Sequence, residues 1–403
     1  MNETTMEQSS EASTSSSLIV PGPLGHSGSA WTFTAFNSED STNLRAMADY
    51  IKKSHFWHHD QGIAKYKEEE RRCHFCQFRA FAIAQKPGCY TMAITNDVDK
   101  EWISLDFRFI DKSIMGKDVK ASLADDGFRS GCECKEDKDC ALDCECLSDL
   151  DPDNIINPKF KNAYYSAGDR KGLLRYELLE TSCDEIYECN DLCACSMDCP
   201  NRVVGRGRKF NIEVFKTSDG RGFGMFSPGQ ASFIPMLIFL AGVRAREDIR
   251  KGQFVDKYVG EILTPEEANR RRDKAPYRKD LYLFALDKFS DPDSEDTRLR
   301  NEPYEVDGEF MAGPTRFINH SCDPNLRIMA VVTDRANKHL HELCFFALCD
   351  IPRLTEFTFD YVAGTNTAED NATVVKKAEE RQEKGEFTQK CLCGSKNCRG
   401  SLW

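Results

Sequence analysis

The sequence contains no hydrophobic run long enough to cross a membrane. Its most apolar stretch, residues 233–243, is far shorter than the roughly 20 residues that a membrane helix needs, and Pro235 interrupts it. The first residues, MNETTMEQSSEASTSSS, lack the basic and apolar regions of a secretory signal. We therefore expect an intracellular chain with no membrane partner.

The sequence also lacks a surplus of basic residues. Its 54 Lys and Arg residues are outnumbered by 66 Asp and Glu residues, which gives a formal net charge of -12. Free nucleic acid is a poor ligand for such a chain, so we expect no sequence-specific nucleic-acid binding and instead a basic partner. Solubility alone is the alternative explanation for the acidic character.

Cysteine, in contrast, is abundant and unevenly spaced. Apart from Cys73 and Cys76, thirteen of the 19 cysteines are candidate zinc ligands. An odd number in an intracellular chain argues against a disulfide framework, and the partners in CxC pairs cannot easily bridge each other. Disulfides remain the alternative. Nine of the candidates form a block in two halves: Cys132, Cys134, Cys140, Cys144 and Cys146, then Cys189, Cys193, Cys195 and Cys199.

These nine cysteines have the number and spacing of a zinc cluster. Three tetrahedral zinc ions need twelve thiolate positions, which nine cysteines provide if three of them bridge two ions each. Such a cluster leaves no position open for water or substrate, so its role is structural. Cys183 lies outside the pattern and is interpreted as a spare buried thiol.

A last cluster, CxCx4C, closes the chain with Cys391, Cys393 and Cys398. It supplies three zinc ligands, and we expect Cys322 to be the fourth, with a ligand elsewhere as the alternative. A further CxxC, Cys73 and Cys76, is a candidate for a separate zinc site but has no second CxxC to pair with.

Composition divides the rest of the chain. Residues 1–40 are rich in Ser, Thr, Gly and Pro and are predicted to be disordered. Residues 41–125 form a partly helical segment, with a helix expected over 41–59. Residues 210–363 alternate short β-rich runs with turns, which predicts a mostly β fold with few helices. Residues 364–386 are a charged linker.

Several motifs follow one another in a fixed order. After the two cysteine halves come GRGFG, YVGEI, RFINHSCDPN, ELCFFAL, FTFDY and the closing CxCx4C. This order resembles the pre-SET, SET and post-SET modules of the suppressor-of-variegation family of histone lysine methyltransferases, most of all its compact fungal members that modify lysine 9 of histone H3. The resemblance covers roughly residues 103–403. It implies a pre-SET module at 126–204, a SET domain at 205–363 and a post-SET module at 387–403, with residues 41–125 packing on the SET domain.

The resemblance implies both a fold and an activity. The fold has small curved sheets around a knot-like crossing, where the FDY segment passes beneath the NHSC loop. The activity is methyl transfer from S-adenosylmethionine to lysine 9 of histone H3, in heterochromatin formation and gene silencing. Three zinc ions in the pre-SET cluster and one in the post-SET site are implied. The implied partners are the histone H3 N-terminal tail and heterochromatin proteins, and the implied location is nuclear chromatin.

The resemblance also implies roles for individual residues. Tyr361 and Tyr258 match hydroxyls that orient the lysine amine, and Phe359 matches a position that sets how many methyl groups fit, with phenylalanine predicting trimethylation. Asn319 and His320 match site residues too, although buried polar groups with a purely structural role are the alternative. The implied cofactor contacts are Gly222, Phe223, Gly224, Tyr282, Arg316, Asn319, His320 and Trp403. The implied substrate contacts are Asp287, Phe359 and Trp403.

One segment departs from the family pattern. Residues 225–242, MFSPGQASFIPMLIFLAG, are mostly apolar and follow the GxG turn directly. Their removal joins Gly224 to Val243 and restores the family's RGFGV, so a translated in-frame intron is one explanation and a genuine insertion the other. A genuine insertion beside the cofactor turn favours an alternative function, a catalytically impaired, zinc-stapled chromatin scaffold. A methyltransferase for a non-histone lysine is a third possibility.

Overall fold

The structure is a computed structural model. It describes residues 31–34, 92–96, 98, 107–122, 130–150, 161–181, 185–218, 241–275, 282–362, 375–376, 379–381, 383 and 390–402. The predictions that fall outside these residues concern the helix over 41–59, Cys73, Cys76, Cys183, Gly222, Phe223, Gly224 and Trp403.

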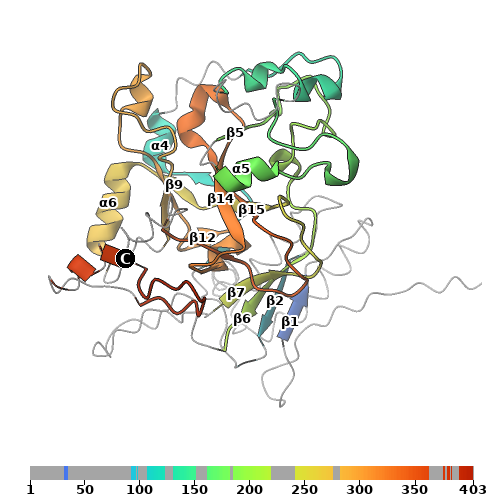
Figure 1. The fold of residues 1–403 in the computed structure, drawn as a ribbon. Coiled ribbons are helices and arrows are strands. Elements are labelled where there is room, and N and C mark those ends of the chain that lie inside the picture. The colour runs from blue at the N-terminus through green and yellow to red at the C-terminus, as the bar shows by residue number, and fades with distance from the viewer. Residues whose placement is uncertain are drawn as a thin grey trace, which may run out of the picture.

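Short strands dominate the described chain (Figure 1). The strands are β1 (Trp31–Thr34), β2 (Met92–Asn96), β3 (Arg108–Phe109), β4 (Ile114–Met115), β5 (Ile186–Tyr187), β6 (Ile212–Lys216), β7 (Ala241–Ala245), β8 (Phe254–Tyr258), β9 (Glu261–Leu263), β10 (Leu283–Ala285), β11 (Glu305–Asp307), β12 (Met311–Ala312), β13 (Asn319–His320), β14 (Leu326–Val332), β15 (Glu342–Ala347) and β16 (Thr358–Phe359). The α-helices are α4 (Lys117–Ser122), α5 (Tyr176–Thr181) and α6 (Pro265–Lys274). The 3-10 turns are η1 (Asp137–Ala141), η2 (Glu145–Leu147), η4 (Gly168–Arg170), η5 (Val204–Arg206), η7 (Thr297–Leu299), η8 (Pro314–Phe317) and η9 (Arg335–Leu340). The predicted mostly β fold with few helices is confirmed.

The strands form several small sheets rather than one large one. Their orders are β1-β2-β6-β7, β10-β11-β9-β4, β5-β14-β15-β8, β12-β3 and β13-β16. The cysteine-rich block lies at one end of the molecule and the β1-β2-β6-β7 sheet at the other (Figure 1). No helix among the described residues is both long and apolar enough to span a bilayer.

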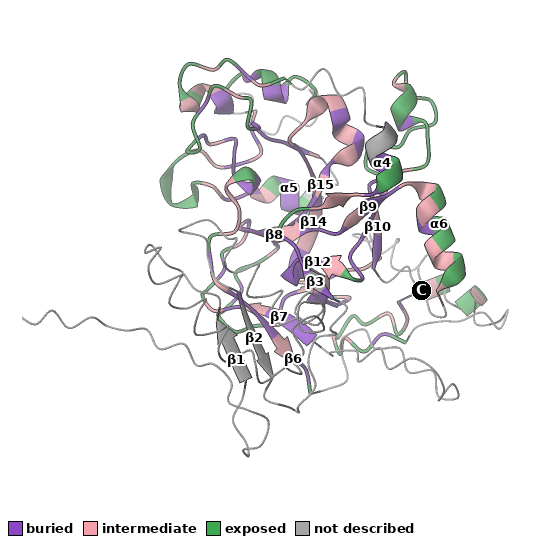
Figure 2. Cartoon of the chain, turned by 180° about the vertical axis from the view of Figure 1, so that it is seen from behind, coloured by how far each residue is buried: buried purple, intermediate pink, exposed green. Residues whose placement is uncertain are grey.

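One apolar cluster joins these sheets into a common core. It includes Val214, Val243, Val255, Phe345 and Phe359, each at most 3% exposed. Figure 2 shows buried residues concentrated in the strands and exposed residues along the loops of the cysteine-rich block. This core therefore includes Phe359 of the FTFDY motif.

The N-terminal segment packs on the 205–363 domain by strand pairing. β2 runs parallel to β6, β3 parallel to β12, and β4 parallel to β9. The structure differs from the predicted disorder of residues 1–40 at β1, which pairs antiparallel with β2. Its sequence, WTFT, alternates aromatic and β-branched residues, a composition suited to a strand, and composition averaged over forty residues hides it.

Helix α6 is anchored to a sheet through its last turn. It begins after Thr264, whose hydroxyl accepts the N–H of Glu267 at 3.4 Å. Arg271 then binds Glu261 of β9 and Asp307 of β11, both at 2.8 Å. The helix therefore fixes two neighbouring strands of the β10-β11-β9-β4 sheet.

The crossing implied by the resemblance is formed by β13 and β16. These strands pair in parallel, with Asn319 opposite Thr358 and His320 opposite Phe359. The N–H of Ser321 then donates to the carbonyl of Phe359 at 3.0 Å. Segments far apart in sequence, NHSC and FDY, thus lie side by side.

A buried carboxylate fixes the chain that follows the last cysteine of the block. Glu188, 2% exposed, accepts hydrogen bonds from the Tyr164 hydroxyl at 2.6 Å and from the N–H groups of Val203, Val204 and Gly205 at 2.9, 2.7 and 2.9 Å. Because every partner is a donor, these bonds favour the ionised carboxylate, while burial raises the pKa of Glu188.

We predict that Glu188→Gln destabilises the protein. The substitution places an amide donor among backbone donors, and such an unsatisfied buried arrangement costs about 2 kcal/mol or more. Chemical denaturation measures the loss. The control is Glu302→Gln at an exposed position, for which about 0.5 kcal/mol or less is expected. Equal losses in the two variants would show that Glu188 has no special role.

Candidate active site and zinc centres

Tyr361 follows β16 and is tied to the segment around β13. Its hydroxyl donates to the carbonyl of Ile318 at 2.6 Å, and its N–H donates to His320 Nδ1 at 3.2 Å. Burial raises the pKa of the Tyr361 phenol well above its usual value. The phenol therefore keeps its proton at neutral pH, and its oxygen can accept a hydrogen bond from a further donor.

Tyr258 is held in a similar way at the end of β8. It is 4% exposed, and its hydroxyl donates to the carbonyl of Tyr282 at 3.1 Å. Burial raises the pKa of this phenol too. A side chain on Gly308 would start 2.4 Å from the Tyr258 oxygen, so only glycine at 308 allows the ring its place.

Both tyrosines belong to a continuous group of rings, which we call the aromatic wall. Ring centroids are 4.5 Å apart for Tyr258 and Phe284, 5.9 Å for Phe284 and Phe359, and 4.6 Å for Phe359 and Tyr361. Phe345 packs behind Phe359 at 4.9 Å. Ring faces attract partly positive groups, and the apolar surface disfavours a full charge.

Tyr282 and Arg316 lie together beside this wall. The Arg316 guanidinium stacks 4.7 Å from the Tyr282 ring, 4.8 Å from Phe317 and 5.4 Å from Phe107. Because the Tyr282 carbonyl also accepts from Tyr258, these two predicted cofactor contacts adjoin the predicted catalytic hydroxyl of Tyr258.

Asn319 and His320 are buried and hydrogen-bonded within the protein. The Asn319 amide donates to the carbonyl of Ala241 at 2.9 Å and to Glu356 Oε1 at 2.7 Å. His320 accepts the Tyr361 N–H on Nδ1, so its own proton is on Nε2. This Nε2 atom lies 3.3 Å from the Cys322 sulfur. Both residues thus position neighbouring parts of the site.

Asp287 is placed differently from the other predicted site residues. It is exposed, beyond the end of β10, and its charge acts on His341. Its exposed position beyond β10 assigns it to the surroundings of the site rather than to its centre.

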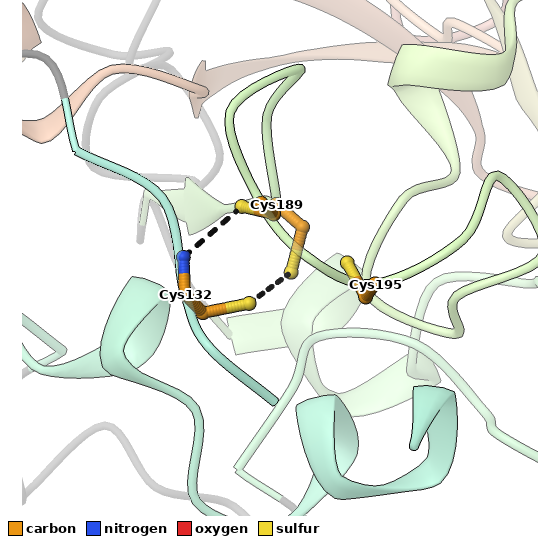
Figure 3. Close-up of side chains that lie close together, drawn as sticks. Cys132, Cys189 and Cys195 are labelled. Atoms are coloured by element: carbon orange, nitrogen blue, oxygen red, sulfur yellow. Dashed lines mark hydrogen bonds between the residues drawn. The ribbon is translucent and has the colours of Figure 1, made fainter. Parts of the chain in front are cut away.

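The cysteines of the block gather into overlapping groups. Figure 3 shows Cys132, Cys189 and Cys195, which come from two separate segments of the chain. Three sets of four sulfurs lie within 4.8 Å of one another: Cys132, Cys189, Cys193 and Cys195; Cys132, Cys140, Cys144 and Cys189; and Cys140, Cys189, Cys195 and Cys199. Shared sulfurs are what a bridged cluster needs. Cys134 and Cys146 are outside these sets, although the Cys146 sulfur lies 3.5 Å from that of Cys193.

The surroundings of these sulfurs fit zinc and not disulfides. The described cysteines are free, and neighbouring sulfurs such as Cys132 and Cys140 are 3.9 Å apart, close to the ~3.8 Å edge of a tetrahedral zinc–thiolate site and far beyond a disulfide bond of about 2 Å. N–H donors point at the thiolates: Asn190 at Cys193 (3.1 Å) and Arg202 at Cys195 (3.2 Å). The disulfide alternative is therefore wrong.

The tail cysteines meet Cys322, as predicted for the fourth ligand. Cys322, Cys391, Cys393 and Cys398 form a four-sulfur group, with 3.8 Å between the Cys322 and Cys391 sulfurs. Hydrogen bonding with Cys391 lowers the pKa of Cys322 to about 3, which favours the thiolate that zinc requires. Zinc there would join the tail to the NHSC loop.

A second link between tail and site is an ion pair that the sequence did not reveal. Arg399 binds Asp360 through two parallel hydrogen bonds, Nη1 to Oδ2 at 2.6 Å and Nη2 to Oδ1 at 2.7 Å, and its side chain is 3% exposed. The Arg399 N–H also points at the Cys322 sulfur. The tail therefore holds the residue that precedes Tyr361 as well as a zinc ligand.

Sequence reasoning also missed Glu356 and Phe284. Asp360 could have been singled out by its position inside FDY, and Arg399, less directly, by its position beside a zinc ligand. Neither pattern shows which partner the side chain meets, because the pairings span distant segments.

Comparisons with known proteins agree with this arrangement. The Pre-SET motif model matches residues 84–202 and the SET domain model residues 241–362. The chain is similar to the H3 lysine-9 specific histone-lysine N-methyltransferase dim-5 of Neurospora crassa, with 48% identity over 360 residues that cover 87% of this chain and 98% of the relative.

Solved structures give the same result. The structure reported under "Structural basis for the product specificity of histone lysine methyltransferases" has a TM-score of 0.60 and 47% identity, covering 77% of this chain and 99% of the other. Arabidopsis thaliana SUVH6 in complex with SAM has a TM-score of 0.53 and 27% identity, covering 79% of this chain and 54% of the other.

We predict that Cys398→Ser removes one zinc ion per chain, because the tail site keeps only three thiolates. Elemental analysis of the purified protein measures the content. Cys349→Ser is the matched control: Cys349 is exposed and lies outside the four-sulfur groups, so its loss leaves the zinc content unchanged. A full zinc complement in Cys398→Ser would contradict the tail site.

We also predict energetic coupling between Arg399 and Asp360. A double-mutant cycle with Arg399→Gln and Asp360→Asn, followed by denaturation, should give a coupling of about 1–3 kcal/mol, since the pair is largely buried. The comparison pair, Lys251 and Glu180, is 2.7 Å apart but more exposed, and about 0.5 kcal/mol is expected. Equal coupling in both pairs would refute the special role of Arg399.

Proposed function

This chain belongs to the SET-domain histone-lysine N-methyltransferases specific for lysine 9 of histone H3, and we propose that it methylates that lysine to the trimethyl state. The observation that carries the proposal is the Tyr361 hydroxyl, which donates to Ile318 and presents its oxygen beside the aromatic wall. An incoming lysine amine can donate an N–H to this oxygen.

The chemical obstacle is the charge of the lysine. Its amine has a pKa of about 10.4 in water, so little of it is nucleophilic at neutral pH. The apolar aromatic wall disfavours the charged form, so the amine loses its proton more readily there. Tyr361 and Tyr258 keep their own protons, so they orient the neutral amine and do not take its proton. Much of the rate comes from this positioning.

S-adenosylmethionine supplies a methyl group on a positively charged sulfur, which becomes a neutral thioether when the amine nitrogen takes the methyl. We assign its contacts to Tyr282, Arg316, Asn319 and His320. Gly222, Phe223, Gly224 and Trp403 complete the proposed contacts by resemblance. Tyr282 and Arg316 support this role through their stacked position beside Tyr258.

Phe359 supports the trimethyl product. It lies between Phe345 and Tyr361 in the aromatic wall and is 3% exposed. A tyrosine here would bring a hydroxyl able to hold a water molecule where an added methyl group must fit. Phenylalanine holds no such water, so the space stays open for the third methyl group.

The substrate is proposed to be the histone H3 tail, bound as an added strand with Asp287 facing its basic side chains. The exposed position of Asp287 and the net charge of -12 support a basic partner. We further propose that the enzyme acts in the nucleus, on chromatin, together with heterochromatin proteins. A scaffold without activity and an enzyme for a non-histone lysine are the outcomes that the assay must separate.

We predict that the zinc-loaded chain converts an H3 tail peptide to the lysine-9 trimethyl form, as seen by mass spectrometry. Phe359→Tyr should stop at lower methyl states while the first transfer stays within about threefold, because only the space for later methyl groups changes. Tyr361→Phe should lose about 100-fold or more in rate, since the amine is no longer oriented.

The control peptide carries arginine in place of lysine 9 and should remain unmodified. No transfer to any peptide or histone would leave the scaffold as the function. Transfer to other proteins but not to H3 would overturn the substrate. Trimethylation by Phe359→Tyr at the rate of the parent chain would overturn the product assignment.

A further inference from the structure

Strand β7 begins inside the apolar segment 225–242. Lys216 of β6 pairs with Ala241, Phe215 with Gly242, and Val214 with Val243. The SET domain match also begins at residue 241. The last two residues of the segment therefore belong to the strand, and the boundary expected after Gly242 lies two residues inside β7.

A side chain at the place opposite Phe215 would force its neighbours to move. A Cβ on Gly242 would lie 2.8 Å from Glu356 Oε1 and 2.8 Å from Cζ of Phe215. Glu356 Oε1 and the Ala241 carbonyl are the two acceptors of the Asn319 amide. A side chain at 242 would therefore push on the groups that hold Asn319.

The sequence offers a second glycine that would directly precede Val243 if the segment were absent. Phe223 and Gly224 precede the segment, just as Ala241 and Gly242 precede Val243. A chain without residues 225–242 reads Phe223, Gly224, Val243, and so presents glycine one position before the same valine. Either form of the chain can fill the place opposite Phe215 with glycine.

We propose that Gly242 takes the strand position that the family pattern gives to Gly224, so that the segment carries its own replacement glycine and leaves the β6–β7 register unchanged. In this chain Ala241 then stands where the shortened chain has Phe223. The segment is thus compatible with the cofactor site next to Asn319. Only the ligand-binding part of this inference rests on the proposed function; the strand register does not.

The test determines which glycine the strand depends on in each form of the chain. Gly242→Ala and Gly224→Ala are compared in the full chain, and Gly224→Ala is repeated in a chain lacking residues 225–242. The readouts are the thermal unfolding midpoint and calorimetric binding of S-adenosylmethionine. In the full chain we expect Gly242→Ala to lower the midpoint by several degrees and to weaken binding about tenfold, while Gly224→Ala, at a proposed cofactor contact outside the strand, leaves the midpoint unchanged. In the shortened chain Gly224→Ala becomes the harmful substitution.

A second variant covers the case in which Gly242→Ala fails to fold. Phe215→Leu removes one of the two groups that the new methyl group would strike, so Gly242→Ala should lower the midpoint less in the Phe215→Leu chain than in the parent chain. Three outcomes would each overturn the proposal: a lower midpoint for Gly224→Ala in the full chain, an unchanged midpoint for Gly224→Ala in the shortened chain, or a shortened chain that does not fold. Absent methyl transfer with the expected pattern of midpoints would count against the proposed function alone.

Discussion

Two strands of two residues each, β13 and β16, pair in parallel and bring the NHSC and FDY segments together. So short a pairing has too few hydrogen bonds to persist alone. It is held from the core side by Phe359 and from the other side by the tail, through Cys322 and through Arg399 on Asp360. The proposed site is therefore built from segments that only tertiary contacts keep in place.

Much of this was predictable from local sequence. Cysteine spacing alone indicated thiolate clusters, and the need for a fourth ligand pointed to Cys322, because zinc accepts four ligands in a fixed geometry. The β-rich runs predicted the fold class, since residues such as those of β15 form a short, buried, apolar strand. Helix α6 was not predicted, although Thr264, Pro265 and Glu267 form a recognisable helix start.

Other features were beyond the reach of sequence. The Arg399–Asp360 pair and the bond between Asn319 and Glu356 join residues far apart in the chain, and no local pattern encodes such partners. The register of β7 was hidden for a related reason. In the sequence, Phe223-Gly224 and Ala241-Gly242 are equally suited to precede Val243. Only the pairing with Phe215 and the closeness of Glu356 distinguish them.

The central claim is that the tail holds the crossing of β13 and β16 in its working arrangement. Amide hydrogen exchange, compared between the zinc-loaded chain and a chain lacking residues 390–403, tests it most directly. We expect faster exchange in the shortened chain at the amides of Ser321 and Tyr361, whose acceptors lie across the crossing, with β14 and β15 unchanged. Equal protection of these two amides in both chains would contradict it.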